Sequence, residues 1–423
     1  MRLAVDVVAC LAAGMCSLQF VRLKIPWGFL TWIPKLVGES GSAYLAVAGG
    51  LGVVGGALLG SWLAVVLGAL AAVVSADYAW RASRPSAGFE EAFGADWRRE
   101  VRPECLAAML KHRFSWRMPS CAKPRWDRDV VFWTVFGDDR TDPRPGAGRP
   151  QAGGRDLLCD LWQPPPGVSP SGLGLIYFHG SAWYLLDKDV GTRPMFRHLA
   201  AQGHVVMDVA YRLCPEVAIR GMVGDVKRAI AWLKAHGRSY GVNPERIALI
   251  GASAGGQIAL LAAYAPSHPQ LTPSELAGSD TAVRGVVSYY GPTDLMLYYH
   301  YLGPKILGGK SNPQDSGFKK SGRLDELLGG QPDEVPEMYE LASPVAHVSS
   351  GSPPTLLFHG EHDMLVPVEG TRVLERKLAA AGVPAASHIF PRTDHAFDLI
   401  LPRVSPAAQA ALYETERFLA GLA

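Results

Sequence analysis

The chain has 423 residues, which is enough for one large catalytic domain and a smaller additional region. Hydrophobic residues make up 48% of it and charged residues only 19%, so it is apolar for a soluble protein. The formal net charge is +2 and the basic residues are scattered, which excludes the basic patch expected of a nucleic-acid-binding protein.

The apolar excess lies in residues 1–80. Residues 3–21 form a 19-residue apolar run, and residues 43–75 form a 33-residue run without a charge. A cleaved signal peptide would explain the first run but not the second, longer one. We therefore predict a membrane-anchoring helical region of two or three passes, followed by a bridge and a catalytic domain.

The second apolar run is too long for one straight span. A helix of 33 residues is about 50 Å long, against about 30 Å of hydrocarbon in a bilayer. We expect it to break at one of two glycine pairs, Gly49-Gly50 or Gly55-Gly56.

Small residues also recur at helical spacing in this run, at Gly52, Gly56 and Gly60. Such a face lets membrane helices pack closely, so it predicts a homodimer through these glycines. The loop at residues 22–35 is rich in Trp, Lys and Arg, which is typical of a membrane interface. The Lys and Arg residues on the two sides of the apolar runs are nearly equal in number, so the orientation of the catalytic domain stays open.

Residues 81–128 mix Trp, Arg and acidic residues. They predict an amphipathic helix near residues 89–112 that acts as a bridge between membrane and catalytic domain, or as a cap over the active site. Farther along, residues 296–348 are irregular and rich in Gly, Pro and Tyr, which favours a lid or a substrate-pocket segment.

Residues 129–423 alternate between short strand-like runs and helical runs. The expected strands are residues 130–136, 157–162, 173–178, 205–209, 247–250, 283–290, 355–359 and 386–390. The expected helices are residues 193–202, 223–235, 254–264, 368–381 and 406–419. This alternation predicts an α/β domain with a mostly parallel sheet flanked by helices, beginning with an antiparallel hairpin.

Ser253 stands between an expected strand and an expected helix, within Gly251-x-Ser253-x-Gly255. A tight strand-to-helix turn needs small residues at these positions and presents the hydroxyl at the tip of the sheet, as in a nucleophile elbow. A second copy of the motif, around Ser239, follows a helix and precedes a strand, so we interpret it as a helix cap and loop.

A serine nucleophile needs a base, an acid that orients the base, and donors for the oxyanion. His395, in the loop after the last strand, is the candidate base, and Asp363, just after the preceding strand, is the candidate acid. Their chain order after Ser253 is the one expected for an α/β-hydrolase. Glu361 and Asp394 are alternative acids.

The oxyanion donors are expected after the strand at residues 173–178. The backbone N–H groups of Gly180 and Ser181, with that of Ala254 after the nucleophile, are placed to converge on the developing charge. The aromatic residues Trp183 and Tyr184 of the same loop are the candidate substrate-binding residues. Other aromatic side chains expected at the pocket are Tyr298, Tyr299 and Phe397.

Taken together, the motifs of residues 129–421 resemble the α/β-hydrolase superfamily, specifically the hormone-sensitive-lipase-like and feruloyl-esterase-like esterases. The matching segments are His179-Gly-Ser-Ala-Trp183, Tyr211-Arg-Leu-Cys-Pro-Glu216, Gly251-Ala-Ser-Ala-Gly-Gly256, Tyr290-Gly-Pro-Thr-Asp294, Gly360-Glu-His-Asp-Met-Leu-Val-Pro367 and Asp394-His-Ala-Phe397. The resemblance implies the α/β-hydrolase fold with an eight-stranded sheet. One departure is Ser181, which replaces the family's second glycine after the oxyanion-loop histidine.

The resemblance further implies a serine carboxylesterase that hydrolyses a small-molecule ester through Ser253, His395 and Asp363. We expect no metal and no organic cofactor, and the six cysteines show no zinc-site spacing. Whether the cysteines pair as disulfides stays open. Lipase, lactonase, acyltransferase or peptidase chemistry by the same residues is the alternative, followed by a non-catalytic ligand-binding protein on this fold.

Overall fold

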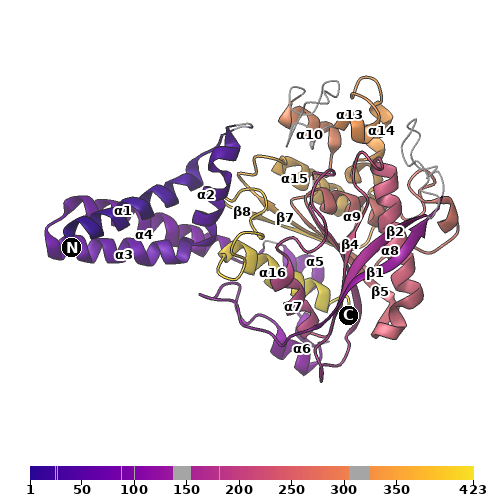
Figure 1. Cartoon of the computed structure of the whole chain (residues 1–423), viewed down its shortest axis with the longest axis horizontal. Coiled ribbons are helices and arrows are strands. Elements are labelled where there is room, and N and C mark those ends of the chain that lie inside the picture. The colour runs from indigo at the N-terminus through magenta and orange to yellow at the C-terminus, as the bar shows by residue number, and fades with distance from the viewer. Residues whose placement is uncertain are drawn as a thin grey trace.

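The computed structural model describes residues 1–423 except 24, 26, 87, 100, 137–153, 181 and 304–323. Its centre is one eight-stranded sheet with strand order β1-β2-β4-β3-β5-β6-β7-β8 (Figure 1). The strands are β1 Arg125–Val135, β2 Arg155–Gln163, β3 Gly172–Phe178, β4 Val205–Ala210, β5 Val242–Ala252, β6 Gly285–Tyr289, β7 Thr355–Gly360 and β8 Ala385–Phe390. Strand β2 is antiparallel to β1 and β4, and all other pairs are parallel. The predicted fold class, including its antiparallel start, is confirmed.

Helices cover both faces of the sheet. The longer ones are α7 Arg193–Ala201, α8 Ile219–His236, α9 Ala254–Tyr264, α10 Leu295–Leu302, α15 Val368–Ala380 and α16 Pro406–Ala420, and the shorter ones are α13 Leu324–Leu328 and α14 Pro336–Leu341. Side chains of α8, α9 and α15 share one buried cluster, and those of α7 and α16 share the other. Strand β3 contributes to both because alternate residues of a strand face opposite sides, as Ile176 and Tyr177 do.

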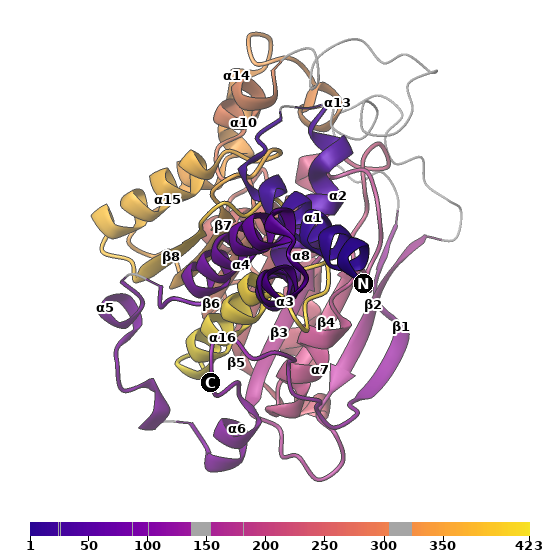
Figure 2. The ribbon, with the colours of Figure 1, turned by 90° about the vertical axis from the view of Figure 1, so that its left-hand side faces the viewer.

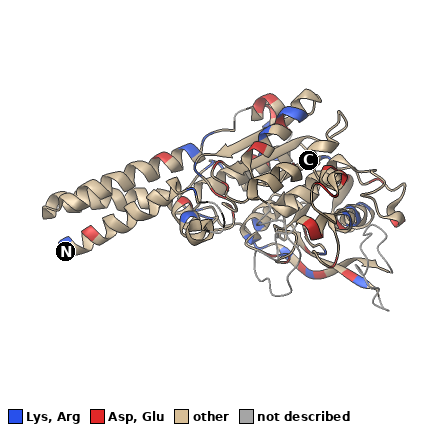
Figure 3. Cartoon of the chain, turned by 90° about the horizontal axis from the view of Figure 1, so that it is seen from above, with Lys and Arg blue, Asp and Glu red and all other residues tan. Residues whose placement is uncertain are grey.

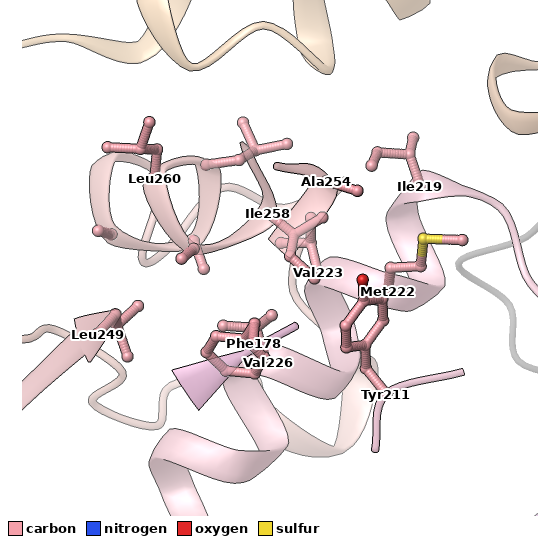
Figure 4. Close-up of a cluster of buried hydrophobic side chains, with 14 of the residues drawn as sticks. Phe178, Tyr211, Ile219, Met222, Val223, Val226, Leu249, Ala254, Ile258 and Leu260 are labelled. Atoms are coloured by element: carbon pink, nitrogen blue, oxygen red, sulfur yellow. The ribbon is translucent and has the colours of Figure 1, made fainter. Parts of the chain in front are cut away.

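The core beneath the expected nucleophile is built from β3, β5, α8 and α9. Figure 4 shows Met222, Val223 and Val226 of α8 together with Ile258 of α9 and Phe178 of β3. These five side chains are fully buried. Close packing of this kind leaves little freedom to the strand end and the helix start that carry Ser253.

The N-terminal region forms a helical bundle that projects from the sheet domain (Figure 1) and is seen end-on in Figure 2. Its helices are α1 Arg2–Ser17, α3 Ser42–Leu59 and α4 Trp62–Ala82, and the helix α2 Gly28–Ser40 lies between α1 and α3 in the chain. By length and composition, Arg2–Phe20, Ser42–Leu59 and Trp62–Ala82 are able to cross a membrane. Figure 3 shows that this bundle carries few charged residues, whereas the sheet domain carries many.

The expected break points in the second apolar run were wrong. The run breaks between α3 and α4, where Gly60 has a left-handed conformation with φ 70° and Ser61 caps α4 by accepting a hydrogen bond from the Ala64 N–H. A left-handed glycine is a common helix end and a serine a common helix start, so the pair ends one helix and begins the next. The Ser61 hydroxyl also bonds the Asp6 carboxylate of α1, which gives that charge a partner inside the bundle.

The glycines at helical spacing pack within the chain. A Cβ on Gly52 would lie 3.3 Å from the Cβ of Ala9 in α1, and one on Gly56 would lie 2.9 Å from the Cβ of Ala64 in α4. Gly60 has nothing within 4 Å. The homodimer through this face stays a prediction, and it would have to form beside these intrachain contacts.

The described residues of 89–112 do not form the long amphipathic helix that we expected. They contain two short helices, α5 Phe89–Phe93 and α6 Pro103–Ala108, with a 3-10 turn at Trp97–Arg99 between them. Glycines with positive φ bracket α5, and Pro103 starts α6, so the helical run is interrupted on both sides.

The same segment runs along α16. The Arg113 guanidinium bonds the Glu414 carboxylate at 2.6 Å, and the Leu110 N–H donates to Glu416 at 2.6 Å. These contacts place residues 110 and 113 against α16, and the role of the segment as a bridge or a cap stays a prediction. The expected lid at residues 296–348 is described only in part, since residues 304–323 lie outside the described residues. All six cysteines are free thiols.

Candidate active site

Ser253 lies on a strained turn between β5 and α9. Its backbone has φ 52° and ψ −123°, a region that costs a non-glycine residue about 1–3 kcal/mol. Its N–H donates to the Tyr289 carbonyl of β6 at 2.8 Å, which holds the strained residue against the neighbouring strand. The geometry is that of a nucleophile elbow, with the hydroxyl at the carboxyl end of the sheet.

The glycines around Ser253 are required by close backbone approach. A Cβ on Gly251 would lie 2.3 Å from the Gly255 carbonyl oxygen, and one on Gly255 would lie 2.1 Å from the Phe178 carbonyl oxygen. No Cβ fits at either distance, so the spacing in the sequence reflects a steric requirement.

We expect Gly255→Ala to destabilise the protein by at least about 3 kcal/mol, because the added methyl group meets backbone of β3 that cannot move aside. Thermal unfolding in detergent, with the yield of folded protein, measures this. The control is Gly351→Ala, in an exposed loop where the new Cβ would meet only the Ser349 hydroxyl at 3.7 Å. Equal stability of the two variants would contradict the steric argument.

Ser253, His395 and Asp363 form a continuous chain of hydrogen bonds. The Ser253 Oγ lies 3.0 Å from His395 Nε2, and His395 Nδ1 lies 2.7 Å from Asp363 Oδ2. The other carboxylate oxygen, Oδ1, accepts the N–H groups of Leu365 at 2.8 Å and Val366 at 2.7 Å. The three side chains come from loops after β5, β7 and β8, which all end at the same edge of the sheet.

Asp363 is ionised in this setting. Its side chain is fully buried, and burial alone would raise the pKa of the carboxyl. The neighbouring rings of His395 and His359, through charge and hydrogen bonds, instead lower this pKa well below its usual range. A buried carboxylate in contact with a histidine ring fixes the ring's tautomer and stabilises the imidazolium form.

The two alternative acids have other partners. Glu361 is partly exposed and accepts the Arg392 N–H at 3.0 Å. Asp394 forms an ion pair with Lys35 at 2.8 Å and accepts the backbone N–H groups of Met364 and His395. Of the three carboxylates, Asp363 is therefore the one bonded to the His395 ring.

The loop after β3 lies against the nucleophile. A Cβ on Gly180 would be 3.1 Å from the Ser253 Cβ, so the Gly180 backbone approaches Ser253 closely. The Tyr211 hydroxyl donates to the His179 carbonyl at 2.9 Å, and its ring stacks on the His179 ring at 4.6 Å. Burial lowers the pKa of His179 to about 4, so this ring is neutral at pH 7. Ser181 lies outside the described residues.

Ala254 is the first residue of α9, where helix N–H groups have no partner within the helix. Gly180 and Ala254 therefore both lie next to Ser253, as the expectation for an oxyanion hole requires. Their role as oxyanion donors stays a prediction.

The aromatic residues that we expected at the pocket are mostly buried. Trp183 is 1% exposed, donates to the Gln257 side chain at 3.0 Å, and packs edge-on against Tyr298 at 5.7 Å. Phe397 is also buried, whereas Tyr184 is partly exposed. Trp183 thus supports the shape of the loop, and its expected contact with substrate stays a prediction together with that of Tyr184.

Residues that the sequence analysis did not assign to the site contact the His395 loop. The Trp32 Nε1 of α2 donates to the His395 carbonyl at 3.0 Å, and Tyr290 places its ring 4.5 Å from the His395 ring. Lys35 of α2 pairs with Asp394, as described above. In the sequence, Trp32 and Lys35 are an aromatic and a basic residue between two apolar runs. That pattern fits a membrane interface as well as it fits a contact with the active site.

The family relationship follows from a comparison of the sequence with family models. The BD-FAE model matches residues 159–378, which is more than half of the chain. The chain belongs to the BD-FAE family. This membership confirms the resemblance to feruloyl-esterase-like and hormone-sensitive-lipase-like proteins of the α/β-hydrolase superfamily. Of the site residues, the matched BD-FAE segment contains Ser253 and Asp363 and ends before His395.

Curated relatives are found in Mycobacterium tuberculosis. The chain is 33% identical over 271 residues to the probable carboxylic ester hydrolase LipM, covering 63% of this chain and 58% of that protein. It is 31% identical over 251 residues to esterase LipQ, covering 58% of this chain and 56% of that protein. The chain thus matches somewhat more than half of the length of these relatives.

Among solved structures, the apo form of Thermogutta terrifontis esterase 2 is similar, with a TM-score of 0.51 and 22% identity. The match covers 70% of this chain and 92% of that protein. At this identity the similarity shows the fold alone, and it agrees with the sheet described above.

Proposed function

We propose that this BD-FAE-family chain is a membrane-anchored serine carboxylesterase. The observation that carries the proposal is the chain of hydrogen bonds from Ser253 through His395 to Asp363, at a strained elbow. The names of the mycobacterial relatives, a carboxylic ester hydrolase and an esterase, support the same reaction class. The three apolar helices of the bundle support the anchor.

In the proposed mechanism the Ser253 hydroxyl attacks the ester carbonyl while His395 Nε2 accepts its proton. Asp363 holds the His395 Nδ1–H and stabilises the imidazolium that forms. The N–H groups of Gly180, Ser181 and Ala254 are the proposed donors to the oxyanion. The imidazolium protonates the departing alcohol. Water then attacks the acyl-enzyme while His395 accepts its proton, and the imidazolium returns that proton to Ser253 Oγ as the carboxylic acid leaves.

The proposal is tested by labelling the purified full chain with a fluorophosphonate, which reacts with activated serines. We expect one equivalent of label on Ser253, found by peptide mass spectrometry, and loss of labelling in His395→Ala. The control is Ser239→Ala, which changes the serine of the second Gly-x-Ser-x-Gly and should label as wild type does. The Ser239 hydroxyl donates to the His236 backbone carbonyl at the end of α8, at 2.7 Å. Absence of label on folded wild type would contradict the proposal.

A further inference from the structure

Helix α2 has two faces of opposite character. The exposed face is apolar and consists of Trp27, Leu30, Ile33 and Val37, with exposed fractions of 68%, 71%, 48% and 37%. Positions three or four residues apart share one side of a helix, so the four form a continuous stripe. The buried residues of α2, which include Lys35, lie on the opposite side.

The buried face of α2 holds the loop that carries His395. Trp32 donates to the His395 carbonyl, the Lys35 Nζ bonds Asp394 Oδ2 at 2.8 Å, and the Ser40 hydroxyl donates to the Ile400 carbonyl at 2.7 Å. Asp394 in turn accepts the N–H groups of Met364 at 3.0 Å and His395 at 2.8 Å with its other oxygen, Oδ1. One carboxylate therefore links α2 to both the acid loop and the base loop.

The link through Lys35 is a buried ion pair. The side chains of Lys35 and Asp394 are 2% and 5% exposed. Removal of one partner from such a pair leaves an uncompensated buried charge, which is strongly unfavourable. Glu39, one turn along α2, accepts the Asp394 N–H at 3.3 Å, and burial raises the pKa of its carboxyl well above the usual range. Lys35 is thus the basic residue that pairs with Asp394, and Glu39 lies beside this pair.

Helix α2 packs against the bundle helices α1, α3 and α4. It lies at the end of the bundle that meets the sheet domain (Figure 1). Helices of 18 and 21 residues are about 27 and 32 Å long, close to the roughly 30 Å of hydrocarbon in a bilayer. If the bundle spans the bilayer, α2 lies at the level of the headgroups, where Trp is favoured and an apolar stripe is covered by lipid.

We propose that α2 rests on the bilayer with its apolar face and positions the His395 loop with its buried face, so that the site takes esters presented at the lipid–water interface. The substrate class is an amphiphilic acyl ester held in the membrane. This inference rests on the proposed esterase function for its substrate, and on the contacts of α2 for its positioning role. Trp32 and Lys35 are positioning residues, because they act on His395 through its backbone and through Asp394.

Bilayer contact is tested without reference to activity. The full chain is placed in phosphatidylcholine vesicles that contain a diazirine-bearing phosphatidylcholine, and crosslinks are mapped by mass spectrometry after illumination. We expect lipid adducts on residues 27–37 and none on the peptide around Val131, an exposed apolar residue of β1. No lipid adducts on residues 27–37, or adducts on the Val131 peptide in equal yield, would overturn the surface assignment.

The roles of the two faces of α2 are distinguished by activity measurements on two substrates. A water-soluble p-nitrophenyl ester and a long-chain ester embedded in vesicles are compared for wild type, Leu30→Gln and the matched control Val131→Gln. Leu30→Gln should lower the rate on the vesicle ester about tenfold and leave the soluble ester within twofold, since one apolar anchor is lost from the interface. An equal effect on both substrates, or none on either, would overturn the interfacial role.

Lys35→Met should lower kcat on both substrates by about tenfold or more with KM little changed, because His395 is present but misplaced. Lys35→Arg, which keeps the cation, should recover most of kcat. A normal kcat in Lys35→Met would overturn the positioning role. A wild type that hydrolyses no ester and takes no fluorophosphonate would refute the proposed function instead, while the lipid crosslinks would still report on α2.

Discussion

Ser253→Ala is expected to lower kcat for a short-chain p-nitrophenyl ester by about a millionfold, the size of effect seen when a serine nucleophile is removed from a Ser-His-Asp enzyme. The reason is that no other hydroxyl lies at the elbow and the acyl-enzyme can no longer form. The thermal unfolding temperature should not fall, because the alanine removes only Oγ from a residue whose backbone is held by β6.

The measurement is steady-state hydrolysis in detergent, with active-site concentration determined on wild type. Ser239→Ala serves as the matched control and should keep kcat within twofold. Residual activity of Ser253→Ala within a hundredfold of wild type would mean that another group is the nucleophile.

Asp363→Asn is expected to lower kcat by about ten-thousandfold. An asparagine amide can donate to His395 Nδ1, which favours the tautomer with the proton on Nε2. That nitrogen faces the Ser253 Oγ at 3.0 Å and would then be unable to accept its proton. The hydrogen bonds to the N–H groups of Leu365 and Val366 can persist through the amide oxygen, so the loop should keep its shape.

The control for Asp363→Asn is Glu361→Gln, on the same loop. Glu361 accepts one backbone N–H and is partly exposed, so the glutamine should keep kcat within about twofold. Hydrolysis rates across a series of pH values compare the two variants. The reverse outcome, with a large loss for Glu361→Gln and a small one for Asp363→Asn, would assign the acid to Glu361.

Much of the sheet domain was predictable because its signals are local. Each strand is a short apolar run bounded by turn residues, and the helix Ala254–Tyr264 was predicted with its observed bounds. The elbow at Ser253 was predictable because the turn leaves no room for a side chain at positions 251 and 255. Both positions must therefore be glycine, which produces the Gly-x-Ser-x-Gly motif in the sequence. The strand order, in which β4 lies between β2 and β3, has no comparable local signal.

The contacts of α2 were not predictable, for a physical reason. Trp32 and Lys35 lie more than 350 residues from their partners in the chain, and a lysine destined for a buried ion pair has the same local pattern as one at a membrane surface. The break at Gly60 was missed because glycine pairs are the stronger local signal for a helix end. Trp183 was expected at the pocket because it is an aromatic residue of the loop after β3. The sequence does not show whether such a side chain packs in the protein core or lines the pocket.

The contacts between the N-terminal helices and the His395 loop also have a consequence for folding. Tyr78 of α4 bonds Thr393, and Asp77 bonds Arg392, beside the contacts of Trp32 and Lys35. The partners in these pairs are separated by 315 to 363 residues in the chain. The N-terminal helices are therefore synthesised long before the loop that they contact. Contacts so distant in sequence cannot form before nearly the whole chain has been made, and their closure entropy slows folding. We therefore expect the loop of the base to be fixed late, and a chain stalled before residue 395 carries its nucleophile without a base.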